Sequence, residues 1–397
     1  MDIRIFPGKL QGNIAAIPSK SQAHRLLICS AFADKETTLI CPDTNRDIEA
    51  TAGCLRSLGA EITRTDRGYR VKPIANIPNT ATLNCEESGS TLRFMLPVAG
   101  ALGVDTTFKM AGRLPYRPIS PLWEEMQRMG CYLTRPTENT IRCCGKLRAG
   151  EFQIDGGVSS QFITGLLLAC ALMDGQSRIS ITGTLGSKPY VDMTMDALKL
   201  FSRNITDFTV SCGQFISPGE ITVEGDWSNA AFFLAAKALG SNITVGNLNF
   251  GSSQGDMACY QLFGDLTSGR TIPCGDIPDL VPILSVVAAA NRGAIFENIR
   301  RLRLKESDRV ASVIAMLSAL GCTATATEDT LSVQPSKFQG GTVDACGDHR
   351  IAMAAAIAAT VAQSPVTILG AECVSKSYPA FWEEYKRLGG QYELNLR

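Results

Sequence analysis

A segment that predicts a helix, a terminating glycine and then strands recurs along the chain, and this recurrence limits the folds open to it. Glycine directly after a helix accepts the left-handed backbone that ends the helix. In the first three clear copies a turn and a second strand follow the first strand. The clear copies are residues 55–71, 126–142, 317–333 and 385–394, and weaker ones are 197–216 and 259–276.

Each copy also contains an earlier strand and a second helix, so the repeating module is strand–helix–strand–helix–strand–strand. The modules recur roughly every 70 residues, which indicates a globular repeat and not a short-period solenoid. A chain of 397 residues built from such modules fits two domains better than one.

Several predicted helices are apolar on every side, whereas the predicted strands carry many charges. Residues 162–173, 280–290 and 351–361 are helical stretches of this apolar kind. Helices that are apolar all round must be buried, and the strands of residues 61–71 have the charges of a sheet face in contact with water. We therefore predict an α/β (α+β) protein with helices inside and sheets outside. Because the apolar runs are shorter than the roughly 18 residues of a membrane span, we expect no membrane partner.

The bulk composition excludes some functional classes. A formal net charge of zero does not favour a nucleic acid partner, which usually requires a basic excess. The fourteen cysteines are scattered without a CxxC pair, and the chain begins without a signal-peptide pattern, so we expect reduced thiols in the cytoplasm. With only two histidines, His24 and His349, we expect no metal site.

Polar clusters rich in Lys, Arg and Ser stand directly before the apolar helices. One such cluster alone indicates an N-cap, and residues 305–309 alone could be surface ion pairs. Many together predict helix N-termini that bind anions, because the backbone N–H groups and the helix dipole favour negative charge there. The clusters are residues 19–25, 87–91, 159–161, 186–190, 226–229, 276–279, 305–309, 347–350 and 374–377.

Common catalytic and nucleotide-binding motifs are missing from the sequence. It has no GxxxxGK[ST] loop, no GxGxxG fingerprint and no GxSxG elbow. His24 and Cys29 do not have the arrangement of a Cys–His dyad. A phosphate would therefore be bound by Lys, Arg, Ser and helix N-termini.

In their order and spacing, nine motifs make the chain resemble the 5-enolpyruvylshikimate-3-phosphate synthase family from end to end. The motifs are PSKSQAHR (18–25), SGSTLR (88–93), RPI (117–119), SSQF (159–162), SKPYVD (187–192), EGD (224–226), KESDR (305–309), DHR (348–350) and KSYP (376–379).

The resemblance implies a two-domain inside-out α/β barrel, in which each domain consists of three βαβαββ units with buried helices. It implies a discontinuous domain of residues 1–18 and 226–397, an inserted domain of residues 19–225, and an active site in the cleft between them.

The resemblance also implies the reaction. The family transfers the enolpyruvyl group of phosphoenolpyruvate to the 5-hydroxyl of shikimate 3-phosphate by addition and elimination, and releases phosphate. These two small molecules are the expected partners, no cofactor or metal is expected, and a monomer is implied.

The site residues follow from the motifs, position by position. For phosphoenolpyruvate they are Lys20, Gly89, Arg117, Gln161, Arg309, Arg350 and Lys376. For shikimate 3-phosphate they are Ser21, Arg25, Ser159, Ser160, Gln161, Ser187, Asp279 and Lys305. Asp279 is the expected base on the 5-hydroxyl, and Glu306 and Lys20 are the candidates for proton transfer at the phosphoenolpyruvate carbon. Arg93, His349 and Arg301 are further candidates for the cleft.

The sequence departs from the family pattern at several of these motifs. Glu87 and Ser88 replace a frequent Asn-Ala, Ser90 replaces a common Thr, and Arg301 stands where Asn is frequent; residues 113–116 are also variant. These differences bear on the response to phosphoenolpyruvate analogues such as glyphosate, and not on the reaction.

Two alternative functions remain open from the sequence. A UDP-N-acetylglucosamine enolpyruvyl transferase shares the fold, but it carries a reactive cysteine shortly before the Arg-Pro pair, where residues 112–116 have none. A non-catalytic anion-binding protein would not need Lys20, Asp279 and Glu306 together.

Overall fold

The computed structural model describes residues 1–266 and 269–395, which form two compact units. Unit 1 comprises Met1–Ile17 and Gly225–Arg397, and unit 2 comprises Pro18–Glu224. The expected domain borders, 18/19 and 225/226, differ from these by one residue each. Residues 267, 268, 396 and 397, which belong to the expected domain 226–397 and in part to the weak repeat copy 259–276, lie outside the described residues.

Unit 2 alternates helices and strands in the order that the repeat predicts. Its first part contains α1 (Lys20–Ala31), β3 (Thr37–Ile40), α2 (Arg46–Ser57), β4 (Glu61–Thr65) and β5 (Gly68–Lys72). Its second part contains β6 (Thr80–Asn84), α3 (Gly89–Leu102), β7 (Asp105–Lys109), the 3-10 helix η1 (Leu114–Tyr116), α4 (Leu122–Arg128), β8 (Cys131–Thr137) and β9 (Thr140–Gly145). Its third part contains β10 (Glu151–Asp155), α5 (Ser160–Cys170), β11 (Ser177–Thr182), α6 (Lys188–Leu200), β12 (Ile205–Thr206), β13 (Thr209–Val210) and β14 (Glu220–Thr222).

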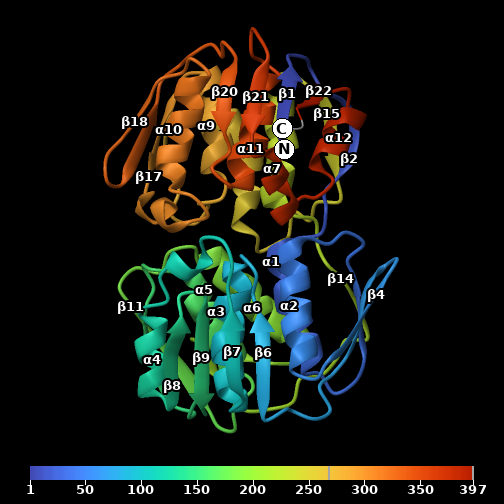
Figure 1. Cartoon of the computed structure of the whole chain (residues 1–397), viewed down its shortest axis with the longest axis vertical. Helices are drawn as coiled ribbons and strands as arrows, with labels where there is room; N and C mark the ends of the chain where they lie inside the picture. Colours follow the sequence, from blue (N-terminus) through green and yellow to red (C-terminus); the bar gives the residue numbers. More distant parts are fainter. Residues whose placement is uncertain (267–268, 396–397) are drawn as a thin grey trace. The chain divides into compact units, whose positions relative to one another are not determined.

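The three sheets of unit 2 share one topology. Their strand orders are β14-β3-β5-β4, β6-β7-β9-β8 and β10-β11-β13-β12. In each sheet the first pair is parallel and the hairpin pair is antiparallel, as Thr80↔Asp105 and Cys131↔Gly145 illustrate. Figure 1 shows β6, β7, β9 and β8 side by side. In the first module, the opening strand is supplied by β14 from the far end of the inserted segment.

Unit 1 follows the same order, interrupted by the insertion of unit 2. Its first part contains β1 (Asp2–Phe6), β2 (Gln11–Ala15), α7 (Trp227–Ala238), β15 (Asn242–Gly246), η2 (Gly255–Ala258) and α8 (Cys259–Asp265). Its second part contains β16 (Thr271–Pro273), α9 (Val281–Ala290), β17 (Ala294–Glu297), η4 (Arg300–Leu304), α10 (Arg309–Ala319), β18 (Ala324–Ala326) and β19 (Thr330–Val333). Its third part contains β20 (Gly341–Asp344), α11 (His349–Ala359), β21 (Val366–Leu369), η5 (Ala371–Lys376), α12 (Phe381–Arg387) and β22 (Gln391–Asn395).

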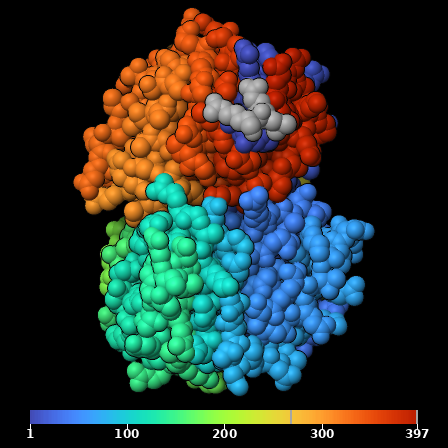
Figure 2. All heavy atoms as spheres, in the orientation of Figure 1, coloured from blue at the N-terminus to red at the C-terminus, as the bar shows by residue number. Residues whose placement is uncertain are grey.

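Two sheets of unit 1 have four strands, with orders β16-β17-β19-β18 and β20-β21-β1-β22. The N-terminal strand β1 lies between β21 and β22, and Figure 2 shows the blue N-terminal segment beside the red C-terminal one. The third sheet pairs only β15 with β2. Within the weak copy at residues 259–276, α8 ends at Asp265 and β16 begins at Thr271.

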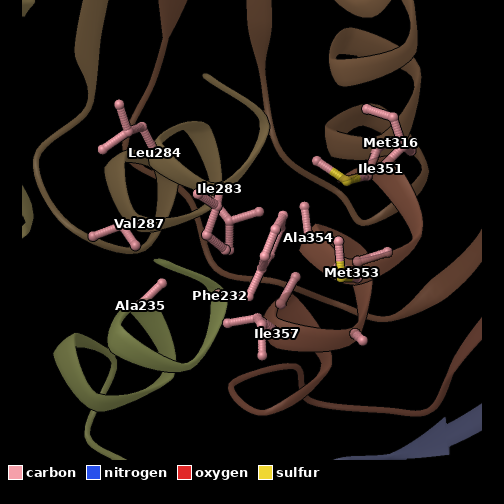
Figure 3. Packing of buried hydrophobic residues seen from close by; sticks show 14 of the residues in the cluster. Phe232, Ala235, Ile283, Leu284, Val287, Met316, Ile351, Met353, Ala354 and Ile357 are labelled. Atoms are coloured by element: carbon pink, nitrogen blue, oxygen red, sulfur yellow. The ribbon is translucent and has the colours of Figure 1, made fainter. Parts of the chain in front are cut away.

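Each unit has its own core of apolar side chains, supplied mainly by helices. Every residue of α11 is buried, as are all residues of α9 except the last. In unit 1, Figure 3 shows Phe232 of α7 packed among Ile283 of α9 and Ala354 and Ile357 of α11. The strands alternate instead, as in β10, where Phe152 and Ile154 point inward between exposed neighbours. The helices therefore lie inside the sheets, as the sequence predicts.

Local signals place the helix ends. Ser19, Ser88, Ser159, Asp226, Asp308 and Asp348 all cap their helices by accepting a hydrogen bond from a backbone N–H of the first turn. The repeat glycines Gly59, Gly130, Gly321 and Gly389 follow helices with φ of 106°, 114°, 79° and 91°. These φ values favour glycine, which explains why the repeat keeps it.

Among the described residues, the longest apolar helices fall short of what a membrane crossing needs.

Candidate active site

The charged stretch 305–309 ends with a buried arginine, Arg309, which is the first residue of α10. Arg309 is 1% exposed and contacts three carboxylates. Its Nε donates to Asp348 at 2.8 Å, its Nη1 to Asp279 at 2.7 Å and its Nη2 to Glu306 at 2.7 Å. Although burial lowers the pKa of Arg309, Asp348, Glu306 and Asp279 raise it well above its ordinary value. Arg309 is thus a permanently charged centre.

Asp279, just before α9, lies among three cations. Its Oδ1 is 2.7 Å from Arg309 and 3.7 Å from Lys305, and its Oδ2 is 2.8 Å from Arg350. Burial alone would raise the pKa of Asp279, but Arg350, Lys305 and Arg309 hold this pKa well below its usual range. The structure therefore brings together Asp279, Lys305, Glu306, Arg309 and Arg350, five of the expected site residues.

Lys305 has a reduced affinity for its proton. Burial lowers its pKa to about 8, with Asp279 acting in the opposite direction and Arg309 in the same direction. The side chain is 27% exposed, so it is close to solvent as well as to Asp279. A lysine of this kind changes charge within the working range of many enzymes.

Asp348 is absent from the expected site residues, yet it holds the cluster in place. It is fully buried, caps α11 through the backbone N of Arg350 at 3.0 Å, and accepts from Ser307 Oγ at 3.2 Å. The same carboxylate accepts from Arg309 Nε, so one residue connects the starts of α10 and α11. The motif 348–350 contained the signal, since a capping Asp precedes the expected Arg350.

The other expected residues of unit 1 lie at loop and helix ends. Arg350 also donates to Ser228 Oγ at 3.1 Å, and His349 is buried beside it at the start of α11. Lys376 lies at the end of η5, not in the first turn of a helix, and its Nζ donates to the carbonyl of Gly347 at 3.3 Å. Arg301 in η4 donates to the carbonyl of Gly275 at 2.7 Å, and burial lowers its pKa.

In unit 2, two arginines approach the start of α3. Arg93 donates to Gln161 Oε1 at 2.7 Å, and Gln161 Nε2 donates to Ser90 Oγ at 2.9 Å. A Cβ added to Gly89 would lie 2.6 Å from an Nη of Arg117 and 2.9 Å from an Nη of Arg93. A side chain at position 89 would therefore push both guanidinium groups away from their present places. Gly89, Arg93, Arg117 and Gln161 are thus neighbours, as an anion site requires.

Lys20, the first residue of α1, pairs with a carboxylate that the sequence analysis did not identify. Its Nζ is 2.9 Å from Asp47 Oδ2, and both side chains are 16% exposed. The backbone of Asp47 accepts from Thr91 Oγ1 at 3.3 Å, and Thr91 bonds to Thr51 at 2.8 Å. Thr51 in turn bonds to His24 Nδ1 at 2.7 Å. A chain of buried hydroxyl groups therefore connects α1, α2 and α3.

Arg25 is buried among neutral oxygens. Its donors reach Thr194 Oγ1 at 2.8 Å, Thr164 Oγ1 at 3.2 Å, and the carbonyls of Ser21 and Tyr190 at 2.6 Å each. Burial lowers the pKa of Arg25 to about 10, which leaves the group protonated at neutral pH. Among the described residues, the printed partners of this cation are thus two hydroxyl groups and two backbone carbonyls, and none is a carboxylate.

The expected serines stand at helix starts. Ser159 caps α5 by accepting from the N of Gln161 at 3.3 Å, and Ser160 is buried as the first residue of that helix. Ser187, directly before α6, has a φ of 56°, a strained value for serine that turns the chain into the helix.

The described residues hold no group of three or more His, Cys, Asp or Glu side chains with the geometry of a metal site.

These features define a class of protein: a two-domain α/β protein in which helix starts carry buried arginines, lysines and carboxylates suited to small anions. The family model described as EPSP synthase (3-phosphoshikimate 1-carboxyvinyltransferase) matches residues 6–385. The chain belongs to this family.

Curated relatives agree with this assignment, and a solved structure agrees with the fold. The 3-phosphoshikimate 1-carboxyvinyltransferase of Clostridium kluyveri is 36% identical and the alignment covers 98% of both chains. That of Clostridium beijerinckii is 37% identical over 99% of this chain and 98% of its own. An EPSP synthase structure from Acinetobacter baumannii superposes with a TM-score of 0.81 at 22% identity and covers 99% of this chain and 100% of that chain. The predicted two-domain fold with buried helices is confirmed.

Proposed function

We propose that this chain transfers the enolpyruvyl group of phosphoenolpyruvate to the 5-hydroxyl of shikimate 3-phosphate and releases phosphate. The observation that carries the proposal is the family match over nearly the whole chain, at positions that include the charged cluster around Arg309. The enzyme is a transferase of the shikimate pathway, which leads to chorismate and the aromatic amino acids.

The reaction needs two proton transfers. The 5-hydroxyl oxygen bonds to C2 of phosphoenolpyruvate as a base takes its proton, and an acid protonates the methylene carbon to give a tetrahedral ketal. Phosphate then leaves and the methyl group loses a proton, which restores the double bond. We assign Asp279 as the base and Glu306 and Lys20 to the carbon-centred transfers.

Phosphoenolpyruvate brings a phosphate and a carboxylate, which arginine binds through its planar fork. The proposal is supported by the proximity of Arg93 and Arg117 to Gly89, and by the pairing of Arg309 and Arg350 with Asp279. The full set proposed for this substrate is Lys20, Gly89, Arg117, Gln161, Arg309, Arg350 and Lys376.

For shikimate 3-phosphate we propose a phosphate contact through Arg25, whose charge is buried among neutral oxygens, and a ring contact through Asp279 and Lys305. Ser21, Ser159, Ser160, Gln161 and Ser187 complete the set, and hydroxyl groups at helix starts suit phosphate oxygens. Arg93, His349 and Arg301 are proposed as supporting residues.

We also propose a monomeric enzyme in the cytoplasm. The many buried cysteines, such as Cys29 and Cys170, suit a compartment that keeps thiols reduced. Light scattering of the purified protein tests the monomer directly.

The activity is tested by measuring phosphate release from phosphoenolpyruvate with shikimate 3-phosphate and, separately, with UDP-N-acetylglucosamine. We expect release only with shikimate 3-phosphate. Release only with the UDP-sugar would replace the proposal by the related enolpyruvyl transferase, and a folded protein silent with both would support an anion-binding role.

A further inference from the structure

The guanidinium group of Arg309 is divided among three carboxylates. An anion binds arginine best through two adjacent nitrogens on one edge of the fork. The Nε/Nη2 edge contacts Asp348, at 2.8 and 3.5 Å. The Nη1/Nη2 edge contacts Asp279 and Glu306, at 2.7 Å each. A bidentate anion can therefore reach Arg309 only by replacing carboxylates of the chain itself.

The three carboxylates differ in how firmly they are held. Asp348 is fully buried and also binds Ser307 and the helix start at Arg350. The side chains of Asp279 and Glu306 are 18% and 24% exposed. The Nη1/Nη2 edge, whose carboxylates are partly exposed, is thus the replaceable one, although Asp279 also pairs with Arg350 at 2.8 Å and lies 3.7 Å from Lys305. The two occupants of this edge are the residues assigned above to proton transfer.

We propose that an anionic group of phosphoenolpyruvate replaces Glu306 and Asp279 on the Nη1/Nη2 edge of Arg309. This exchange releases Glu306 from Arg309 and leaves Asp279 with Arg350 and Lys305 as its cations, so that both carboxylates become available for proton transfer. This inference rests on the proposed function and adds that the substrate itself activates the acid and the base. Before the exchange the carboxylates act as internal competitors of the substrate.

The exchange has a physical consequence for Asp279. A carboxylate beside cations is a weak base, because each cation stabilises its charged form. Arg309 is one of the three cations that hold the pKa of Asp279 well below its usual range, the others being Arg350 and Lys305. Losing Arg309 to the substrate raises this pKa and makes Asp279 a better proton acceptor.

The test compares substrate affinity with turnover in Glu306→Gln and Asp279→Asn. The dissociation constant of labelled phosphoenolpyruvate is measured by equilibrium dialysis at fixed pH and salt, after thermal unfolding has shown that each variant folds. We expect binding about tenfold tighter than in the wild type, equal to about 1.4 kcal/mol, because an internal competitor is removed. Phosphate release with shikimate 3-phosphate falls by roughly 10² or more, because a proton-transfer group is lost.

Asp308→Asn is the matched control. Asp308 precedes Arg309 in the chain, pairs with Arg303 at 3.5 Å and caps α10 through the N of Ala311. Asparagine caps a helix as well as aspartate, so the variant removes one nearby negative charge without changing the fork of Arg309. We expect its affinity for phosphoenolpyruvate to stay within about twofold of the wild type, since an exposed charge is screened.

Each other outcome overturns the inference. Unchanged or weaker binding in both Glu306→Gln and Asp279→Asn would show that these carboxylates do not compete with the substrate. Equal tightening in Asp308→Asn would assign the effect to net charge. If neither the wild type nor any variant bound phosphoenolpyruvate measurably, the substrate would not be the anion that displaces these carboxylates. A failure of the proposed function is distinguished from these outcomes, because wild-type protein would then release no phosphate from the two substrates.

Discussion

Arg25 and Arg309 are both buried arginines within the first two turns of a helix, yet the protein balances their charges in opposite ways. Arg309 contacts three carboxylates, whereas the hydrogen bonds of Arg25 described above go to two threonine hydroxyls and two backbone carbonyls. The pKa of Arg309 is raised well above its ordinary value, and burial lowers that of Arg25 to about 10.

If both arginines bind the substrates as we propose, the difference gives two ways to prepare a cation for an anionic substrate. Around Arg25 the described residues bury a charge among neutral acceptors, and in our proposal this positive field is kept for the phosphate of shikimate 3-phosphate. Around Arg309 the charge is already balanced, so an external anion must compete. In our proposal the arrangement around Arg25 favours anion binding directly, whereas the one around Arg309 couples anion binding to the release of carboxylates.

The largest expected effect separates the two arginines by stability. Arg309→Met removes the cation that three neighbouring carboxylates share, and we expect a loss of about 3–5 kcal/mol in the free energy of unfolding. Arg25→Met leaves only neutral acceptors unpaired, which costs about 1–3 kcal/mol. Urea unfolding of both variants measures the difference, and equal losses would break the comparison.

A smaller effect is expected in the hydroxyl chain of unit 2. Thr51→Val removes the group between His24 Nδ1 and Thr91 Oγ1 and leaves both without this partner. We expect a loss of about 1–3 kcal/mol in unfolding free energy. Thr51→Ser keeps the hydroxyl and should retain most of the stability. If serine is as destabilising as valine, the methyl group of Thr51 contributes as much to stability as its hydroxyl; if valine causes no loss, the hydrogen bonds do not stabilise the three helices.

The lowered pKa of Lys305 predicts that stability and substrate binding change with pH through the charged cluster of unit 1. Its folded pKa of about 8 lies below the ordinary lysine value of 10.5. Above pH 8 the folded protein holds fewer protons than the unfolded chain, so this group makes the protein more stable as pH rises from about 8 to 10.5. Substrate binding follows the opposite direction, because the neutral amine no longer attracts an anion.

We therefore expect the KM for shikimate 3-phosphate to rise above pH 8 in the wild type, by up to about tenfold per pH unit. Lys305→Arg stays charged throughout this range and should show a flat profile. A rise that persists in Lys305→Arg would assign the titration to another group.

The smallest effect serves as the reference for the others. Arg142 and Asp105 form an exposed bidentate pair at 2.6 and 2.9 Å on the sheet of unit 2. Because solvent and salt screen such pairs, we expect Arg142→Ala to leave the urea midpoint within experimental error. A loss comparable with that of Thr51→Val would show that surface pairs matter here as much as the buried network.

The amino-acid sequence determined the modules and the local structure. The repeat glycines, the capping Ser and Asp residues and the apolar helices are encoded within a few neighbouring positions, since capping and burial follow the helical period. Residues 305–309 were likewise recognisable as a charged site, because five adjacent positions contain its unusual composition.

The tertiary structure alone decided which charges meet. Asp279 reaches Arg309 across 30 positions, and Asp348 reaches it across 39. Thr164 and Thr194 reach Arg25 across 139 and 169 positions. Lys20 and its partner Asp47, 27 positions apart, belong to different helices. No local pattern encodes such pairs, because they depend on how separate helices pack. This packing determines whether the charge of a buried arginine is balanced by carboxylates or surrounded by neutral acceptors.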